Sequence, residues 1–590
     1  MKKTLKKLFV TSSAAAIFAA GFVPFAVNAQ ETDENGIVQF ESEVEHEGEA
    51  IEGGTLRFAL NSDSNFEGLL NNMFYQSAYD ADVIGWFAES LYGYDSNYTI
   101  DNSGFADIEF NQEAKSVTIT IPEGVKWHDG EDVTIDDVIF PYYVIGDPEY
   151  TGIRYGESFT NVVGMEEFHN GEAEEISGLN RIDDYTLEVS YHNFPNSMMQ
   201  AGGGVSSYIE PEHVFEGIAV ADMENSDPVR QNPIGFGAFK VEQITPGEAV
   251  TFTRFDDYYQ GTPKLDGVQL EVVSPTTIVT EMNNGNYDIA SLPTDAFDTY
   301  ADASNYTVLG VPENAYTYIG FKMGTWNEEE GKVNYDPELV VSNKALRQAM
   351  AYAVDNDAVA TEFYQGTREG ANSAIPPMFT EYHNPDQEGY TYDPEQAKQI
   401  LADAGFVDND GDGFVEDPNG EAFQLNFASM AGGDTAEPLA LYYLQMWNEI
   451  GIDIQLVNDQ LLEFNSFYER IQTDDPEIHV YQAAWGTGGD PNPTDLYGPN
   501  ANFNYTRWEN EDHNAILDKL NSDDAFDPDF KTEAFNEWQA FMHEEAPIFP
   551  TLFRNKIWGV NDRVKFYDVQ YGSDFGLHEL QLTAEEPAAE

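Results

Sequence analysis

The sequence predicts an α/β protein that contains several sheets, because strand-like and helix-like segments are mixed along the chain. Residues 117–121, 186–190 and 452–456 show the two-residue alternation of half-buried strands. Residues 343–354 instead place apolar side chains at i, i+3, i+4 and i+7, which is one face of a helix. Since no repeat, low-complexity tract or long linker divides residues 53–580, we expect mixed sheets flanked by helices.

A second helix is predicted from its end signals. Asp393 is typical of an N-cap, Pro394 of a first helical turn and Gln396 of a capping box. Gly405 supplies the terminating glycine. A third helix, over about 439–450, leads directly into the last of the three strands.

The composition indicates a folded protein with an acidic surface. The chain has 590 residues, with 27 basic and 106 acidic side chains and a net charge of −79. Such a charge disfavours nucleic acid and anionic membranes as partners. A hydrophobic content of 41%, with 39 Phe, 33 Tyr and 8 Trp, is too high for a disordered acidic chain. Self-repulsion of this size is tolerated best where salt screens it, so we expect a saline, halophilic setting.

The start of the chain predicts export. Residues 1–29 combine four lysines, an apolar stretch and small residues up to Ala29, as in a signal peptide cleaved after Ala29. The alternative is a retained membrane anchor. We expect an extracytoplasmic protein that is secreted, periplasmic or associated with the cell envelope. Residues 30–52 and 583–590 are acidic and weakly patterned, which predicts a disordered leader and a disordered tail.

Motifs of the common hydrolases and nucleotide-binding enzymes are absent. The sequence has no G-x-S-x-G elbow, no H-E-x-x-H zinc motif and no glycine-rich phosphate loop. It has no cysteine, which excludes disulfides, thiolate metal sites, a cysteine nucleophile and lipid attachment to an N-terminal cysteine. Glycoside cleavage needs a pair of carboxylates, but among 106 acids many such pairs arise by chance, so their presence does not indicate a glycosidase. We expect a protein that is not an enzyme and requires no cofactor.

One acidic loop has the spacing of a calcium-binding loop. Asp408, Asp410 and Asp412 stand at positions 1, 3 and 5, Phe414 offers a carbonyl at position 7, and Glu416 is the acid at position 9. Position 12, where a bidentate glutamate is usual, holds an asparagine. The loop is therefore either a structural calcium site of reduced affinity or a solvated acidic turn.

A second candidate site lies in the aromatic and glycine-rich segment Tyr481–Pro493. The segment predicts a strand that runs into a flexible loop, which presents Asp490 between glycine and proline. From the residues alone, a capped turn beside a core tryptophan and a ligand site both remain open.

Several short segments occur in a characteristic order along residues 53–580. They are GGTL at 53–56, ESLYG at 89–93, IPEGVKWHDG at 121–130, DDVIF at 136–140, NPIGFGAFK at 232–240, YYQGTPKLD at 258–266, NKALRQAMAYAVD at 343–355, WGTGGDPNP at 485–493 and APIFP at 546–550. Together they resemble the oligopeptide-binding solute-binding proteins of ABC importers, family 5. NVVGM at 161–165, GEA at 171–173 and EFNSFY at 463–468 are similar to the Gram-positive branch of that family.

The resemblance implies a two-lobed, periplasmic-binding-protein-like fold that closes on its ligand in a venus-flytrap motion. Lobe I would consist of 53–92, 231–305 and 546–585, with an extra subdomain at 93–230, and lobe II of 306–545. The signal peptide 1–29, the leader 30–52 and the acidic tail 586–590 would flank them. Hinge crossings are then expected near 308–312 and 545–550, where prolines interrupt strand patterns.

The resemblance also implies the residues that contact ligand. Asp490 stands where members of the family hold the N-terminal ammonium of a peptide. The preceding strand would pair with the peptide main chain through Ala483, Ala484, Trp485 and Gly486. A loop after the first strand would do the same from lobe I through Ser64, Asn65 and Phe66.

Two functional hypotheses of different classes follow. The first is an extracytoplasmic receptor, monomeric and without nucleic acid, that captures oligopeptides by main-chain recognition and delivers them to the permease subunits of an ABC transporter. Within the same fold, a nickel complex, an oligosaccharide or a signalling peptide are alternative ligands. The second hypothesis is a secreted protein outside transport, such as an enzyme or a scavenger of signalling peptides.

Overall fold

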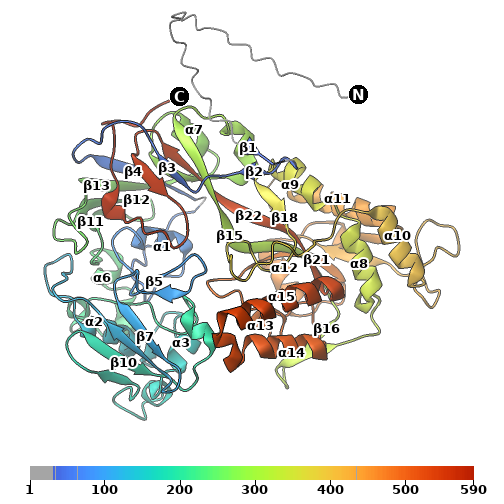
Figure 1. Ribbon diagram of the computed structural model, residues 1–590, viewed down its shortest axis with the longest axis horizontal. Coiled ribbons are helices and arrows are strands. Elements are labelled where there is room, and N and C mark those ends of the chain that lie inside the picture. The colour runs from blue at the N-terminus through green and yellow to red at the C-terminus, as the bar shows by residue number, and fades with distance from the viewer. Residues whose placement is uncertain (1–30, 34, 63, 434) are drawn as a thin grey trace, which may run out of the picture.

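The computed structural model describes residues 31–33, 35–62, 64–433 and 435–590, and the predicted signal peptide lies outside these ranges. An eleven-stranded sheet runs through the molecule in the order β11-β12-β13-β4-β14-β22-β15-β21-β19-β20, with β18 attached to β22. The β11–β14 end of this sheet belongs to lobe I and the β21–β20 end to lobe II, on the left and right of Figure 1. No helix in the described ranges is long and apolar enough to cross a membrane.

Lobe I is organised around strand β4, which is buried on both faces. Leu56, Phe58 and Leu60 pack into one hydrophobic cluster, and Ala59 packs into another on the opposite face. Because both faces are covered, β4 can pair in parallel with β13 and β14. The elements are β4 (Thr55–Asn61), α1 (Ala78–Ile84), β11 (Phe239–Thr245), β12 (Ala249–Arg254), β13 (Gly267–Val273), α7 (Ile278–Asn283) and β14 (Ile289–Leu292).

The extra subdomain has its own sheet and its own core. The predicted strands at 117–121 and 186–190 are confirmed as the antiparallel neighbours β8 and β10. Trp127 is 1% exposed, and its indole N–H donates to Asp137, which also accepts from Thr134 N at the start of α2. The elements are β5 (Gly93–Tyr94), β6 (Ile100–Asp101), β7 (Asp107–Asn111), β8 (Ser116–Thr120), α2 (Ile135–Gly146), α3 (Glu157–Thr160), α4 (Met165–His169), β9 (Leu179–Arg181), β10 (Thr186–Ser190), α5 (Val220–Met223) and α6 (Asp227–Arg230).

Lobe II packs helices around the other end of the sheet. The helix predicted at 343–354 is α8, and the helix predicted from its caps is α10, where the Asp393 carboxylate accepts from Gln396 N at 2.9 Å. The third predicted helix, α11, begins three residues earlier than expected. The elements are β16 (Gly324–Asn327), β17 (Lys332–Tyr335), α8 (Lys344–Tyr352), α9 (Asn356–Tyr364), β18 (Arg368–Gly370), α10 (Pro394–Asp403), β19 (Leu425–Ala428), α11 (Ala436–Glu449), β20 (Ile454–Leu456), α12 (Phe464–Gln472), β21 (Val480–Gly486), α13 (Thr494–Tyr497), α14 (Glu511–Leu520) and α15 (Pro528–Glu545).

Two long antiparallel strands, β15 (Tyr306–Phe321) and β22 (Ile548–Asn561), join the lobes. Their register shifts where Pro312 pairs with Asn555 and Tyr316 pairs with Phe553. Three residues of β15 therefore face one residue of β22, which is a bulge that bends the pair. We expected prolines to interrupt the hinge strands, but Pro312 lies inside β15, at this bulge.

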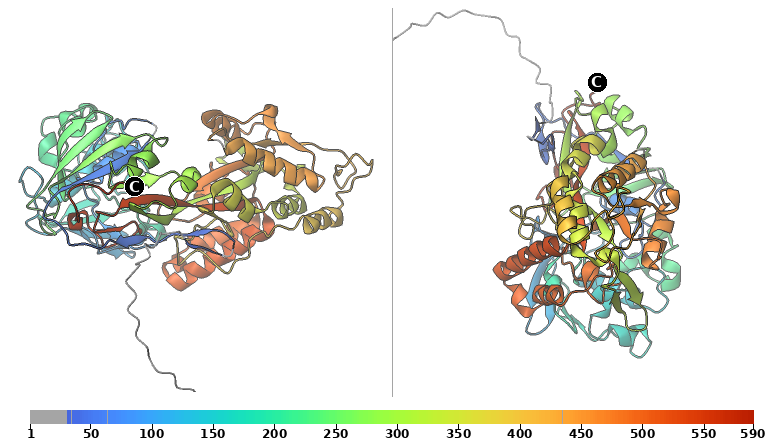
Figure 2. Two further views of the ribbon diagram at one scale, coloured as in Figure 1. Left: turned by 90° about the horizontal axis from the view of Figure 1, so that it is seen from above. Right: turned by 90° about the vertical axis from the view of Figure 1, so that its right-hand side faces the viewer.

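The acidic leader, which we expected to be disordered, is instead ordered and lies across these hinge strands. Val38 N donates to Gly366 O of lobe II at 2.9 Å, and Gly310 N of β15 donates to Glu41 O at 3.0 Å. The leader strands are β1 (Glu31–Thr32), β2 (Val38–Gln39) and β3 (Glu43–Glu45), and β3 pairs with β23 (Phe566–Asp568). Figure 2 shows the leader running along the hinge from one lobe to the other. The compositional prediction was wrong here because buried apolar side chains at 37 and 38 pack into the lobes.

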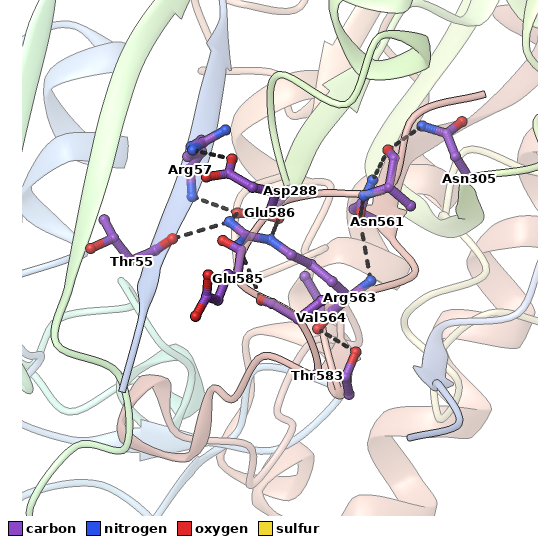
Figure 3. Close-up of polar contacts among 12 residues, drawn as sticks. Thr55, Arg57, Asp288, Asn305, Asn561, Arg563, Val564, Thr583, Glu585 and Glu586 are labelled. Carbon is purple, nitrogen blue, oxygen red and sulfur yellow. Dashed lines mark hydrogen bonds and ion pairs between the residues drawn. The ribbon is translucent and has the colours of Figure 1, made fainter. Parts of the chain in front are cut away.

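The acidic tail is likewise held against lobe I, by the buried cation Arg563 (Figure 3). Its guanidinium makes two hydrogen bonds to Asp288, at 2.6 and 2.7 Å, and donates to the carbonyls of Ala584 and Glu585. Ala588 N donates to the side chain of Asn561 at 2.9 Å. The expectation of a disordered tail fails because the tail supplies carbonyl acceptors to a guanidinium that has five donors.

Replacing Arg563 with Met should lower the free energy of unfolding by about 3–5 kcal/mol, because it leaves a fully buried carboxylate without its partner. Urea unfolding at fixed salt measures this. The matched control is Arg181→Met, which breaks a pair of half-exposed side chains and should cost less than about 1 kcal/mol. Equal small losses from both substitutions would show that the Arg563 network does not hold lobe I together.

Candidate functional site

Strand β21 has a free edge. It pairs with β15 on one side along its whole length, from Val480 to Gly486. On the other side, β19 reaches only Val480 and Tyr481, and no strand in the described ranges pairs with residues 482–486 there. A free edge can take up an extended chain through main-chain hydrogen bonds, whatever the side chains of that chain are.

Four of the predicted ligand-binding residues lie on this edge. They are Ala483, Ala484, Trp485 and Gly486. Ala483 is buried, Trp485 is half-buried and Gly486 is exposed, so the edge emerges from the core towards its end. The Trp485 ring stacks on the Tyr505 ring at 5.1 Å between centroids, which fixes the tryptophan beside the edge.

The loop after β21 is tied to the hinge and presents Asp490. Thr487 N donates to Asn314 O of β15 at 2.8 Å, and the Asn314 side chain donates to Gly488 O at 2.8 Å. One Asp490 oxygen accepts from Asn492 N at 3.0 Å, and no described residue donates to the other. Burial raises the pKa of the Asp490 carboxyl, and the charge of Lys531 opposes this shift. Asp490 is therefore a partly desolvated carboxylate with one oxygen available to a ligand.

Asp490 lines a pocket of about 500 Å³ between lobe II and the extra subdomain. The lobe II wall is formed by 487–490, Asn492, Thr494, Asp495 and Asn521. The other wall is formed by Ser158, Asn161, Pro195, Ser197, Met198 and 201–204. This volume is within the range of small-molecule sites, and it accommodates part of an extended peptide.

The two walls touch beside the pocket. A Cβ added to Gly489 would lie 2.4 Å from Ala201 O, so only glycine permits this approach. Gln200 of the subdomain donates to the Tyr382 hydroxyl of lobe II at 3.0 Å. The subdomain loop is therefore in contact with lobe II next to Asp490.

A buried cation lies near the same carboxylate. Lys531 on α15 is 6% exposed, and its Nζ lies 4.9 Å from the centroid of the Tyr382 ring. Burial lowers the pKa of Lys531, whereas the charges of Asp490 and Glu381 raise it. No carboxylate of a described residue lies within 4.0 Å of this Nζ. Lys531 therefore balances part of the Asp490 charge without direct contact.

The predicted lobe I contacts lie elsewhere. Ser64 and Asn65 are exposed, and neither lines the Asp490 pocket. Asn65 lies beside Gly247, in the turn between β11 and β12. Phe66 is 3% exposed, and its side chain packs in the hydrophobic core of lobe I. The role of this loop stays a prediction.

Sequence reasoning missed the partners that other segments bring to Asp490, which are Lys531, Tyr382, Gln200 and the glycine run 202–204. The glycine run was the one signal available, because consecutive glycines allow two backbones to approach closely. The sequence did not indicate that Lys531 is buried, since a lysine in an acidic amphipathic helix is expected to be exposed.

The acidic loop brings three of its predicted metal ligands together. Carboxylate oxygens of Asp408, Asp410 and Glu416 all lie within 4.8 Å of one another. Glu416 is 7% exposed and accepts from Asn409 N at 2.7 Å, which aims it into the loop. Asp412 is outside this group and accepts from Phe414 N instead.

Comparison with known proteins identifies the family. A model of the bacterial extracellular solute-binding proteins, family 5 Middle, matches residues 82–507. The oligopeptide-binding protein OppA of Lactococcus lactis subsp. cremoris is 28% identical over 507 residues, which cover 84% of each chain. The oligopeptide-binding protein AppA of Bacillus subtilis is 26% identical over 410 residues, which cover 69% of each chain.

The fold comparison agrees. Lactococcal OppA, complexed with an endogenous peptide in the closed conformation, superposes with a TM-score of 0.72 at 27% identity, covering 90% of this chain and 100% of that chain. The predicted two-lobed α/β fold is thereby confirmed. Because the family model spans most of the sequence, the chain belongs to the bacterial extracellular solute-binding proteins of family 5.

Proposed function

We propose that this protein captures oligopeptides outside the cytoplasm and delivers them to the permease subunits of an ABC importer. The observation that carries the proposal is the free edge of β21, which ends beside the pocket that contains Asp490. Two relatives that match most of the chain are named for oligopeptide binding, which supports the same ligand class. We further propose that the protein works as a monomer, without enzymatic activity and without a required cofactor.

The β21 edge recognises the peptide main chain. A peptide enclosed between two lobes loses water from its N–H and C=O groups, and each unpaired group costs roughly 1–3 kcal/mol. Pairing with residues 483–486 satisfies those groups for any peptide sequence. The receptor therefore accepts many sequences.

Asp490 binds the N-terminal ammonium of the peptide. Main-chain pairing cannot satisfy a desolvated cation, whereas a carboxylate with a free oxygen can. Lys531 shares the charge of this carboxylate, so the ammonium gains less than it would from an isolated aspartate.

Replacing Asp490 with Ala should weaken a free-amine pentapeptide by about 2 kcal/mol, roughly thirtyfold. Acetylating the peptide should cost the wild type a similar amount and the variant little more. Isothermal titration calorimetry with both peptides on both proteins measures the coupling. Asp495→Ala is the matched control, because Asp495 lines the same pocket and carries the same charge.

The outcomes separate the alternatives. Additive losses from acetylation and from Asp490→Ala would remove Asp490 from the ammonium site, even if peptides bind. Native mass spectrometry that finds a nickel complex or an oligosaccharide bound in place of a peptide would overturn the ligand class.

We also propose that Asp408, Asp410 and Glu416 hold a structural calcium ion, because their oxygens converge and carboxylates are the preferred ligands of calcium. Chelation should then lower the melting temperature and calcium should restore it, since an ion that binds only the folded state stabilises that state. Asp410→Asn should abolish the effect, whereas Asp412→Asn, outside the converging group, should largely retain it. Magnesium at matched ionic strength is the control for screening, and a melting temperature that ignores calcium contradicts the site.

A saline setting is the third proposal, and it rests on the net charge of −79. The melting temperature should rise with sodium chloride, because the screening length falls from about 30 Å at 0.01 M to about 3 Å at 1 M. A chelator in every sample keeps calcium binding from contributing to the change in melting temperature. Potassium chloride should raise the melting temperature as much as sodium chloride does. A flat or falling melting temperature over this range would contradict the proposal.

A further inference from the structure

Tyr98 of the extra subdomain has a backbone conformation that tyrosine rarely adopts. Its φ angle is 60°, in the left-handed region that glycine and asparagine usually occupy. The residue lies in the turn between β5 and β6, where one Asp95 carboxylate oxygen accepts from Asn97 N and from Thr99 N, both at 2.9 Å. Strained residues persist where the surrounding structure holds them, and they concentrate at functional sites. Tyr98 is therefore a candidate functional residue.

The strained turn directs the Tyr98 ring into lobe II. Tyr98 is 9% exposed and packs in the hydrophobic cluster of lobe II, not in that of its own subdomain. Its ring stacks on the Tyr94 ring at 4.9 Å between centroids and lies 5.9 Å from the Phe379 ring of lobe II. A glycine would suit the turn better but would lose this packing. The tyrosine therefore serves the contact with lobe II and not the turn itself.

The ring also lies against the loop that contains Asp490. A Cβ added to Gly489 would lie 3.1 Å from Tyr98 Cδ1 and 2.4 Å from Ala201 O. The residue directly before Asp490 thus fits between a side chain and a carbonyl of the subdomain. Asn314 of β15 binds the start of the same loop. Tyr98 therefore holds the end of the loop that carries the carboxylate.

Polar contacts fix the turn on lobe II beside the ring. The Asn97 side chain is 4% exposed and accepts from Glu381 N at 3.1 Å and from the Thr380 hydroxyl at 3.3 Å. Ala201 N donates to Tyr98 O at 2.7 Å, which ties the turn to the glycine-rich wall of the pocket. The turn and this wall therefore meet lobe II as one unit.

These contacts join two parts of the chain that have separate hydrophobic clusters, one in the subdomain and one in lobe II. A peptide enclosed between the two walls leaves only when the walls separate, so the contacts of Asn97 and Tyr98 break on release. Contacts that break on release favour the closed state, and the population of that state sets the apparent affinity.

We propose that Tyr98 is a positioning residue for the ammonium site. Its ring holds the Asp490 loop against the subdomain, which keeps the carboxylate at the peptide amine and slows release of the peptide. Tyr98 acts through Asp490 and not by contact with the peptide. This inference rests on the proposed peptide-binding function.

The test combines Tyr98→Gly with a free-amine pentapeptide and its N-acetylated form, on the full chain. Glycine relieves the backbone strain and removes the ring. The variant should bind the free-amine peptide about tenfold more weakly, mainly through faster release, and the acetylated peptide less than about threefold more weakly. Calorimetry measures the affinities, and stopped-flow displacement of a fluorescent peptide measures release. Tyr98→Phe keeps the ring and should retain the wild-type values.

Gly489→Ala tests the same contact from lobe II. The added methyl group would collide with Ala201 O and crowd Tyr98, so this variant should also lose most of the preference for the free amine. Melting temperatures of all unliganded variants report folding.

Each variant has a matched control that should leave affinity and release unchanged. Lys115→Gly is the control for Tyr98→Gly, because Lys115 has a φ angle of 53° in another turn of the same subdomain, between β7 and β8. Gly85→Ala is the control for Gly489→Ala, because the nearest atom that its added Cβ would meet lies 3.6 Å away.

Equal weakening of both peptides by Tyr98→Gly would overturn the positioning role, because Tyr98 would then act on the lobes as a whole. Unchanged affinity and release would overturn it as well, and a lowered melting temperature alone would leave Tyr98 a purely structural residue. In these cases peptide binding by the wild type stands. Equal affinity of the wild type for the two peptides would remove the ammonium site together with this inference. Failure of both peptides to bind would contradict the proposed function itself.

Discussion

The pairing of β15 with β22 is the interaction on which the rest of the structure depends. These two strands stay paired along most of their length, from Tyr306 opposite Asn561 to Gly320 opposite Ile548. Each lobe covers its own part of the pair with a separate hydrophobic cluster. The ladder shifts register at the bulge between Pro312 and Tyr316 and again between Thr317 and Tyr318. These irregularities bend the strand pair without ending its pairing.

Two neighbouring residues of the bulge make contacts beyond strand β15. Glu313 pairs with Arg554 at 2.7 Å, while its neighbour Asn314 holds the loop that contains Asp490 through Thr487 and Gly488. Residues of the bulge are thus in contact with both the Asp490 loop and strand β22. The leader adds a third connection, because Glu41 O accepts from Gly310 N a short distance along the same strand. These contacts join the leader, the hinge strands and the Asp490 loop to one another.

The sequence predicted local structure well and long-range contacts poorly. Asp393 caps α10 as expected, because a cap depends on residues within one turn. The leader and the tail were mispredicted because their order comes from distant partners, such as Gly366 for Val38 and Arg563 for the tail carbonyls. Asp490 was predicted from a motif and its role stays a prediction, whereas the positions of Lys531 and the Arg368–Arg554 pair depend on register and helix packing that no local pattern contains.

The few cations of this chain are stabilised in two different ways. Lys322 and Arg507 are both buried against Asp474, and Arg563 is buried against Asp288. A buried cation costs free energy unless it is paired, so these pairs are part of the fold. Lys531 and Arg368 differ, because each packs against a tyrosine ring and makes no ion pair within the described ranges. Their charges act at longer range, and that of Lys531 opposes the burial that raises the pKa of Asp490.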